Sequence, residues 1–413
     1  MQNELDNFAV HCILILVKRL YDELLSVHLS ALRQMVFLSG PRQVGKTTCA
    51  KALGDFYVDW DAGAHQALIL GGAEKVAAEA GLHVLGQRPV TVVFDELHKN
   101  PNWRQFLKGF FDVYEDRCRV IVTGSSKLDT YRRGGDSLMG RYFPYRMHPF
   151  STRELLSTDL PGDGLVRPPM EMDDAAWGAL CEHGGFPEPL SKGSARFTRR
   201  WQDLRFDQLY KEDVRDMTRI QEIPLVGILG RLLQERSAEQ LVVANLARDV
   251  GVAPNTLKSW VEALCSLHAG FLVRPWSKNV SKTLRKEPKW FLRDWSGIQN
   301  PGQRAETFVA CHLLKAVEGW EDMGLGKFGL HYLRDTLKRE VDFLVSKDGE
   351  PWFLVEVKSG AKKLSPALSH FQQQTGAPHA FQVSMDLDYV EADCFSLTTP
   401  VIVPAKTLLS QLL

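Results

Sequence analysis

One stretch of this sequence, residues 34–48, constrains the fold more than any other. It reads QMVFLSGPRQVGKTT, an apolar run and then a loop bounded by glycines. The loop fits the pattern GxxxxGK[ST], in which successive backbone N–H groups point inward at phosphates and the following helix adds its dipole. The alternative is a chance match, but the apolar strand before the loop and the helix-forming residues after it favour a nucleotide site. The residues expected to contact the nucleotide are Gly40, Pro41, Arg42, Gln43, Val44, Gly45, Lys46, Thr47 and Thr48.

Two residues of this loop and two later acids have defined roles in nucleotide hydrolysis. Lys46 would pair with the β- and γ-phosphates, and the Thr47 hydroxyl would ligate Mg²⁺. The run VTVVFDE at residues 90–96 fits a buried strand of a parallel sheet that ends in two carboxylates. Asp95 would hold Mg²⁺ through water, and Glu96 would orient and polarise the attacking water. A solvated pair of acids is the alternative, but the preceding loop favours ATP and Mg²⁺ as cofactors.

A third strand and two arginines extend the predicted site. Residues 119–123 fit a buried strand, which Ser125 and Ser126 follow. In P-loop ATPases with an inserted strand, a polar residue at this strand end senses the γ-phosphate, so either serine is a candidate. Arg141, and after it Arg133, would stabilise charge in the transition state, in cis or from a neighbouring subunit. The second case implies a homo-oligomer, whereas most surface arginines have no such role.

Residues 245–264 predict a helix, a glycine turn and a second helix, the pattern of a helix-turn-helix. A strand at 271–276 and the stretch up to 291 would complete a wing. Lys+Arg and Asp+Glu are both 50, so any surface that attracts nucleic acid must be local. Between positions 274 and 293, the acid Glu287 is outnumbered by seven basic residues: Arg274, Lys278, Lys282, Arg285, Lys286, Lys289 and Arg293. We therefore predict that this segment contacts DNA; the alternative is a module that packs on another domain or protein.

The last third of the chain carries a second set of charged residues with a chemical pattern. Glu306 lies near the start of an amphipathic helix, and Asp342 and Glu356 lie on two strands joined by a turn. Because strand side chains alternate, Glu356 and Lys358 share a face, which Asp342 can join from the adjacent strand. Asp342 and Glu356 can bind Mg²⁺, with Glu306 as a further ligand, while Lys358 helps to deprotonate water or offsets charge. The alternative is a surface ion-pair cluster.

This order of helical Glu, strand Asp, hairpin and apolar strand with ExK is similar to the PD-(D/E)XK nuclease superfamily. The whole chain resembles a prokaryotic AAA-type ATPase family whose C-terminal domain of uncharacterised function itself resembles restriction-endonuclease-like folds. The resemblance implies ATP and Mg²⁺ roles for Lys46, Thr47, Asp95 and Glu96 and adds little about substrate. The other motifs that carry it are GPRQVGKTT at 40–48, FDELH at 94–98, GSS at 124–126, LMGR at 138–141 and GGFPE at 184–188.

The predicted fold is a multidomain α/β protein. With 413 residues the chain is long enough for several cores. The expected segments are an N-terminal helix at 1–33, a P-loop NTPase parallel sheet at 34–150, a helical lid at 151–222, a winged helix at 223–290 and a restriction-endonuclease-like α/β domain at 291–413.

The sequence also bounds the cellular context. Seven widely spaced cysteines without a CxxC pair suit a reducing cytosol, so a cytoplasmic location is expected. The apolar run at 8–17 is too short for a stable membrane span, which needs roughly 20 residues. We expect a helix from Phe8 to Leu29 that packs on the next domain, with a membrane-associated N-terminus as the alternative.

These patterns predict a Mg²⁺-dependent ATPase that engages DNA through the winged helix and cuts it with the C-terminal domain. The alternative is an ATP-gated regulatory or partner-binding protein whose nuclease-like domain is catalytically inactive.

Overall fold

The computed structural model describes residues 18–84, 88–124, 138–162, 164–218, 220–277, 287–360 and 363–413. These residues form two compact units, an N-terminal unit from Lys18 to His148 and a C-terminal unit from Pro149 to Leu413. The predicted boundaries at 222 and 290 both fall inside the C-terminal unit, and the division into five segments remains a prediction. None of the helices in these ranges is both long enough and apolar enough to cross a bilayer.

The described residues of the N-terminal unit form a sheet of five strands, all parallel. Across the sheet they run β2 (Phe56–Asp59), β3 (Val90–Asp95), β4 (Cys118–Thr123), β1 (Met35–Ser39) and β5 (Tyr142–Arg146). Strand β4 is thus inserted between β1 and β3. The apolar runs of β1 and β3 are buried on both faces, as a parallel sheet covered by helices requires. The predicted parallel α/β sheet is confirmed.

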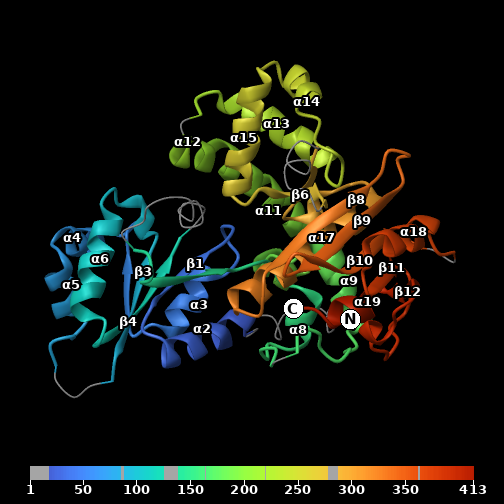
Figure 1. The fold of residues 1–413 in the computed structure, drawn as a ribbon. Helices are drawn as coiled ribbons and strands as arrows, with labels where there is room; N and C mark the ends of the chain where they lie inside the picture. Colours follow the sequence, from blue (N-terminus) through green and yellow to red (C-terminus); the bar gives the residue numbers. More distant parts are fainter. Residues whose placement is uncertain are drawn as a thin grey trace, which may run out of the picture. The chain divides into compact units, whose positions relative to one another are not determined.

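Helices cover both faces of this sheet (Figure 1). Met35 and Phe37 of β1 pack in one hydrophobic core with α4, α5 and α6. Val36 and Leu38 alternate with them and are also buried, on the face of α2 and α3. The helix expected from Phe8 to Leu29 is observed as α2 from residue 20, and residues 1–17 lie outside the described ranges. The helices are α2 (Leu20–Ala31), α3 (Lys46–Leu53), α4 (Gly63–Leu70), α5 (Ala73–Glu79) and α6 (Trp103–Tyr114).

The C-terminal unit begins with helices and ends with a sheet. Helices α14 and α15 are joined at Gly251, which has φ 80°, and the hairpin of β6 and β7 follows them. Helices α13, α14 and α15 lie together at the top of Figure 1. The helices are α8 (Thr152–Leu156), α9 (Asp174–His183), α10 (Pro187–Lys192), α11 (Ala195–Asp207), a π-helix (Gln208–Asp213), α12 (Val214–Met217), α13 (Ile223–Glu235), α14 (Val243–Val250), α15 (Pro254–Ser266), α17 (Pro301–Asp322), α18 (Pro366–Thr375) and α19 (Ala405–Ser410).

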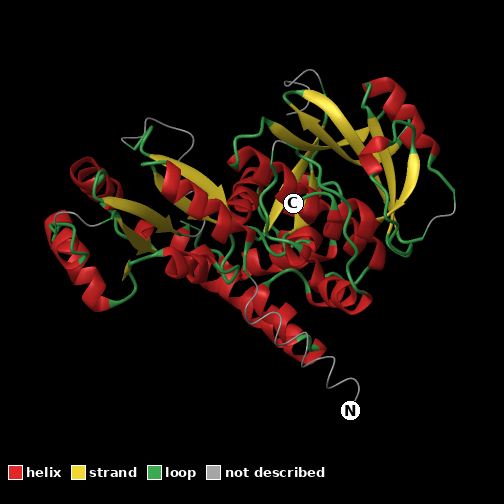
Figure 2. Ribbon diagram, turned by 90° about the horizontal axis from the view of Figure 1, so that it is seen from below, coloured by secondary structure: helices red, strands yellow, loops and turns green. Residues whose placement is uncertain are grey.

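In the described residues the sheet of the C-terminal unit has seven strands and is mixed. Strands are drawn in yellow in Figure 2. Strands β8, β9 and β10 are antiparallel, whereas β11 and β12 continue parallel to β10, and β6 pairs parallel with β8. The hairpin assigned to the winged helix therefore shares a sheet with the C-terminal strands. The strands run in the order β12 (Val401–Pro404), β11 (His379–Ser384), β10 (Glu350–Lys358), β9 (Glu340–Lys347), β8 (Phe328–Arg334), β6 (Gly270–Pro275) and β7 (Lys289–Leu292).

Candidate nucleotide site and carboxylate cluster

The loop between β1 and α3 has the backbone shape that a phosphate loop needs. Gly40 and Gly45 have φ of 145° and 105°, and Gln43 between them also has a positive φ, 63°. A Cβ at Gly40 would lie 2.3 Å from the carbonyl oxygen of Met147, so only glycine fits there. The buried Lys46 Nζ donates to the carbonyl oxygens of Gly40, at 2.9 Å, and of Pro41, at 2.8 Å. The lysine is thereby held across the mouth of the loop.

Asp95, the last residue of β3, is buried and accepts three hydroxyl hydrogen bonds. Its Oδ2 accepts from Thr47 Oγ1 at 2.8 Å and from the Tyr57 hydroxyl at 2.7 Å, and its Oδ1 accepts from Thr123 Oγ1. Burial and the bond to Asp95 raise the pKa of Tyr57, so this phenol stays a donor. Because β2, β3 and β4 are parallel, Tyr57, Asp95 and Thr123 lie together at the carboxyl ends of these strands. Sequence reasoning predicted Thr47 and Asp95 but missed Tyr57 and Thr123, which are recognisable only once the strand order is known.

Glu96 follows Asp95 with an unusual backbone. Its φ is 52°, a left-handed conformation that is uncommon for residues other than glycine and that recurs at functional sites. Its Oε2 lies 3.4 Å from Lys99 Nζ and 3.7 Å from His98 Nε2. Burial is the main cause that raises the pKa of this carboxyl above its ordinary value. A carboxylate with a raised pKa is a better general base, which fits the role predicted for it.

Arg19 binds the backbone of the phosphate loop at Val44. The sequence did not indicate this role. Arg19 is buried at the start of α2, where its Nη1 donates to the carbonyl oxygen of Val44 and its Nη2 donates to that of His148 at 2.6 Å. The Tyr21 hydroxyl accepts from the backbone N–H of His148 at 2.9 Å. A cation at a helix N-terminus is unfavourable because it opposes the helix dipole. An arginine at that position in a sequence therefore indicates that its side chain binds a specific group elsewhere in the fold.

Of the arginines and serines beyond residue 123 that were predicted to act at the nucleotide, the structure describes Arg141 alone. Arg141 pairs with Asp112 through contacts of 2.6 and 3.0 Å. It precedes the amino end of β5, whereas the phosphate loop follows the carboxyl end of the parallel strand β1. Arg141 is therefore far from its own phosphate loop, and only the role toward a neighbouring subunit remains as a prediction. Ser125, Ser126 and Arg133 lie outside the described residues.

A second cluster surrounds Lys289 in the C-terminal unit. Its buried ammonium group lies 2.8 Å from Glu306 Oε1 on α17. The two acids of β9 are also close, with Glu340 Oε1 at 2.6 Å and Asp342 Oδ1 at 3.6 Å. Sequence reasoning identified Glu306 and Asp342 but not Glu340, although alternation along β9 places it on the face of Asp342.

The predicted ExK residues adjoin this cluster. Lys358 Nζ lies 2.7 Å from Glu356 Oε1. Asp342 Oδ2 accepts a hydrogen bond of 2.8 Å from the backbone N–H of Val357, because β9 and β10 pair side by side. The structure thus brings Glu306, Asp342, Glu356 and Lys358 together as predicted, and it adds Lys289 and Glu340. We call these six residues the carboxylate cluster.

Burial disfavours the ionised form of the acids in the carboxylate cluster. Burial, together with the neighbouring Asp342, raises the pKa of Glu306 to about 8 and that of Glu356 to about 7. Burial also raises the pKa of Asp342. No three His, Cys, Asp or Glu side chains of the described ranges are arranged so that they could hold a metal ion between them. The ammonium of Lys289 supplies the positive charge among Glu306, Glu340 and Asp342 instead.

The basic segment predicted to contact DNA is smaller than the sequence suggested. Lys289 is 4% exposed and is surrounded by acids, so its charge is not free for a phosphate. Arg293 is 8% exposed and lies 5.6 Å from the centre of the Phe271 ring. Lys278, Lys282, Arg285 and Lys286 lie outside the described residues. Counting these residues by sequence alone overlooked that strand β7 is buried.

The strand order, the glycine loop and the Thr47–Asp95 contact define a P-loop nucleotide-binding domain. Residues 32–156 match the family described as AAA domain. This match supports an AAA-type P-loop domain in the N-terminal unit, as the resemblance implied. Residues 175–299 match the domain of unknown function DUF8612, and residues 301–396 match the domain of unknown function DUF4143.

Two curated relatives match over most of the chain. They are the uncharacterized proteins Rv2008c of Mycobacterium tuberculosis and Mb2031c of Mycobacterium bovis. Each is 22% identical over 326 residues, which is 77% of this chain and 69% of the relative. Among solved structures, AMPPCP-bound DnaA from Aquifex aeolicus matches with 12% identity and a TM-score of 0.30 over 59% of this chain and 85% of that one. A TM-score this low supports no inference about this chain.

Proposed function

We propose that this protein is a Mg²⁺-dependent ATPase. The observation that carries the proposal is the position of Asp95, which three hydroxyl groups hold at the sheet edge beside the phosphate loop. Mg²⁺ in nucleotide sites is bound by one or two protein groups together with waters and phosphates. Thr47 and Asp95 fit that donor set, so they would hold the ion, which neutralises charge on the phosphates.

The remaining residues of the site would act on the nucleotide and the attacking water. Lys46 leaves its two carbonyl partners for the β- and γ-phosphates. Glu96 accepts the proton of the water, which its raised pKa favours. Thr123 at the end of β4 takes the place predicted for Ser125 or Ser126, since its hydroxyl lies beside the ion ligand Asp95. Arg19 keeps the loop in the binding shape at Val44.

Replacement of Lys46 tests nucleotide binding. We expect Lys46→Ala to lose ATP binding, because the variant lacks the ammonium that meets the β- and γ-phosphates. Isothermal titration of the full chain with ATP and Mg²⁺ measures this. Lys108→Ala, which removes an exposed lysine from α6, is the matched control and keeps wild-type affinity. Equal affinity in Lys46→Ala and the control would refute the assignment of the loop.

A metal-dependent nuclease in the C-terminal unit is the second candidate function. Support comes from the element order α17, β8, β9, β10, α18, β11, which resembles the PD-(D/E)XK pattern, and from the contact of Glu356 with Lys358. Glu356 Oε2 is buried and has no hydrogen-bond partner in the described part of the chain, so it could serve as an ion ligand. Bound Mg²⁺ would supply an activated water. The ammonium of Lys289 counts in favour of the inactive, partner-binding alternative.

Nicking of DNA decides between these two alternatives. If the C-terminal unit is a nuclease, the full chain nicks single- or double-stranded DNA with Mg²⁺ or Mn²⁺, and Asp342→Asn loses that activity. Glu391→Gln removes an exposed acid and serves as the control. Absence of nicking by the wild-type protein would exclude the nuclease and leave the partner-binding alternative.

DNA remains the proposed partner of α14 and α15. Support comes from their order before a β-hairpin and from the exposed basic residues Arg248 and Lys258. The exposed Glu262 on α15 weakens the local positive charge.

A further inference from the structure

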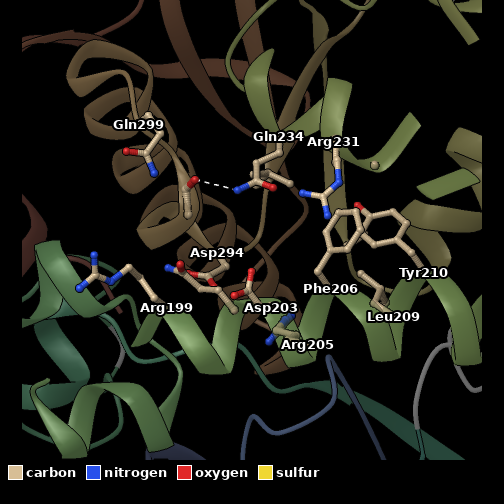
Figure 3. A pocket seen from close by; sticks show the side chains of 15 residues that line it. Arg199, Asp203, Arg205, Phe206, Leu209, Tyr210, Arg231, Gln234, Asp294 and Gln299 are labelled. Carbon is tan, nitrogen blue, oxygen red and sulfur yellow. Dashed lines mark hydrogen bonds between the residues drawn. The ribbon is translucent and has the colours of Figure 1, made fainter. Parts of the chain in front are cut away.

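A cavity of about 310 Å³ opens between α11, α13 and the segment that follows β7 in the C-terminal unit (Figure 3). Its wall includes the π-helix at Gln208–Asp213, and such helices recur at functional sites. Besides Asp203, Asp294 and Tyr210, the polar side chains that line it are three arginines and three glutamines, namely Arg199, Arg205, Arg231, Gln202, Gln234 and Gln299. Neither the nucleotide site nor the carboxylate cluster uses any of them.

Two of these arginines are positioned by aromatic rings rather than by acids. The guanidinium of Arg205 lies 3.6 Å from the centre of the Phe186 ring, and that of Arg231 lies 4.7 Å from the centre of the Phe206 ring. Figure 3 shows Arg231 beside Phe206. Within the described residues neither arginine forms an ion pair with a carboxylate. Arg205 Nη1 is buried and has no hydrogen-bond partner there. Guanidinium N–H groups that are not paired with an acid can donate hydrogen bonds to the oxygens of a carboxylate or phosphate.

Two acids, Asp203 and Asp294, also line the cavity, so the arginines outnumber them by three to two. Asp294 is engaged by its own loop, where its Oδ1 accepts from Ser296 Oγ at 2.6 Å and from the backbone N–H of Ser296 at 3.1 Å. Burial raises the pKa of Asp294, and the nearby Arg205 and the hydrogen bonds from Ser296 oppose that rise. Burial lowers the pKa of Arg205 to about 10, so that guanidinium still carries its charge at neutral pH. Asp203, the other acid in the wall, is exposed.

The GGFPE motif at 184–188 packs against two residues that line this cavity, Asp294 and Arg205. Gly184 has φ 80°, and a Cβ there would lie 2.8 Å from Asp294 Oδ1. Phe186 is the ring on which Arg205 stacks. On the other wall, a Cβ at Gly230 would lie 2.5 Å from Tyr210 Cε1, so glycine lets that ring close the cavity. Gln234 Nε2 donates to the carbonyl oxygen of Gly297 at 2.8 Å, which fixes the third side. These contacts among the chain's own residues give the cavity its shape.

We propose that this cavity binds a small anion whose phosphate or carboxylate group is held by Arg205 and Arg231. Its volume is near the lower end of small-molecule sites, about 300–1,000 Å³. A separate small molecule therefore fits it better than a polynucleotide strand. The glutamine amides would bind the neutral part of the ligand. The site is independent of ATP hydrolysis.

Binding of simple anions to a full chain that lacks the phosphate-loop lysine tests the proposal. In a Lys46→Ala background, inorganic phosphate, citrate and AMP are titrated by calorimetry, and a short single-stranded oligonucleotide forms a separate arm. We expect at least one small anion to bind. Arg205→Lys, which keeps the charge but loses the planar fork, and Arg231→Gln should each weaken binding about tenfold or more. Arg196→Gln, which removes an exposed arginine of α11 that does not line the cavity, should leave it unchanged.

The proposal is overturned by any of three results. These are no binding of any small anion, binding by the oligonucleotide alone, or equal affinity in Arg231→Gln and Arg196→Gln. Thermal melting of each variant guards against misfolding, and Arg231→Gln keeps the test decisive if Arg205→Lys fails to fold. Loss of ATP hydrolysis in other variants has no bearing on this result.

Discussion

A Glu96→Gln variant is expected to bind ATP with wild-type affinity and to hydrolyse it about a hundredfold or more slowly. The amide keeps the size and most hydrogen bonds of the carboxyl group but cannot accept a proton from water, and general bases contribute roughly 10²–10⁴-fold to rate. Lys46 donates to the carbonyl oxygens of Gly40 and Pro41, and Thr47 donates to Asp95, so we expect the phosphate contacts to survive the change at Glu96. Titration with ATP and a phosphate-release assay on the same preparation separate binding from hydrolysis.

The acidic limb of the wild-type pH profile gives a second readout for Glu96. Its carboxyl pKa is raised above the ordinary value, chiefly by burial, so hydrolysis should begin to fall at a higher pH than for an exposed glutamate. The residual activity of the variant should lack this limb. Glu74→Gln removes an exposed acid of α5 and should behave as the wild type. Normal turnover in Glu96→Gln would contradict the role given to this residue.

The residues of the nucleotide site that lie close together in sequence could be predicted from the sequence. The loop at 40–48 and the pair Asp95–Glu96 each lie within one strand-to-loop transition, so their spacing alone carries the signal. Tyr57 and Thr123 contact Asp95 from two other strands, and that contact depends on the order of strands in the sheet. Arg19 and Val44 are 25 positions apart in sequence, so no short sequence pattern indicates their contact.

The carboxylate cluster shows the same limit in another form. Strand alternation and a hairpin were enough to bring Asp342 to Glu356. Lys289 joins them because β7, a strand before α17, is part of the same sheet, whereas by sequence it belonged to a basic loop. A basic residue in a run of basic residues has the same sequence signature whether it is solvated or buried against acids, so burial had to come from the structure.

A Lys289→Met variant is expected to destabilise the C-terminal unit by about 3–5 kcal/mol at neutral pH. Methionine keeps the length of the side chain but removes the charge among Glu306, Glu340 and Asp342. The Lys289 side chain is only 5% exposed, and removal of one partner from a buried ion pair leaves uncompensated charge in a poorly solvated site. Urea unfolding of the full chain, followed by tryptophan fluorescence, measures the loss.

The loss should depend on pH in a defined direction. The pKa of Glu306 is raised to about 8 and that of Glu356 to about 7, both above the value of about 4.3 expected in the unfolded chain. The folded state therefore holds protons that the unfolded state releases between these values, so the free energy of unfolding falls as pH rises through this window. Lys289 lowers the pKa of Glu306, so its removal strengthens the effect. The variant should be closest to wild type near the acidic end and furthest from it above about pH 8.

Lys358→Met provides the matched control, because it removes the other ammonium of the carboxylate cluster. That side chain is 45% exposed and pairs with one carboxylate, so its loss should cost about 1 kcal/mol or less. A small, pH-independent change in Lys289→Met, equal to that of the control, would mean that water or bound ions already neutralise the acids. A large change that shrinks as pH falls would instead establish Lys289 as the cation that the four carboxylates require in the folded protein. Any metal bound by Glu306 and Asp342 must then compete with this ammonium, which is why the nuclease assay and the stability of this variant report on the same charges.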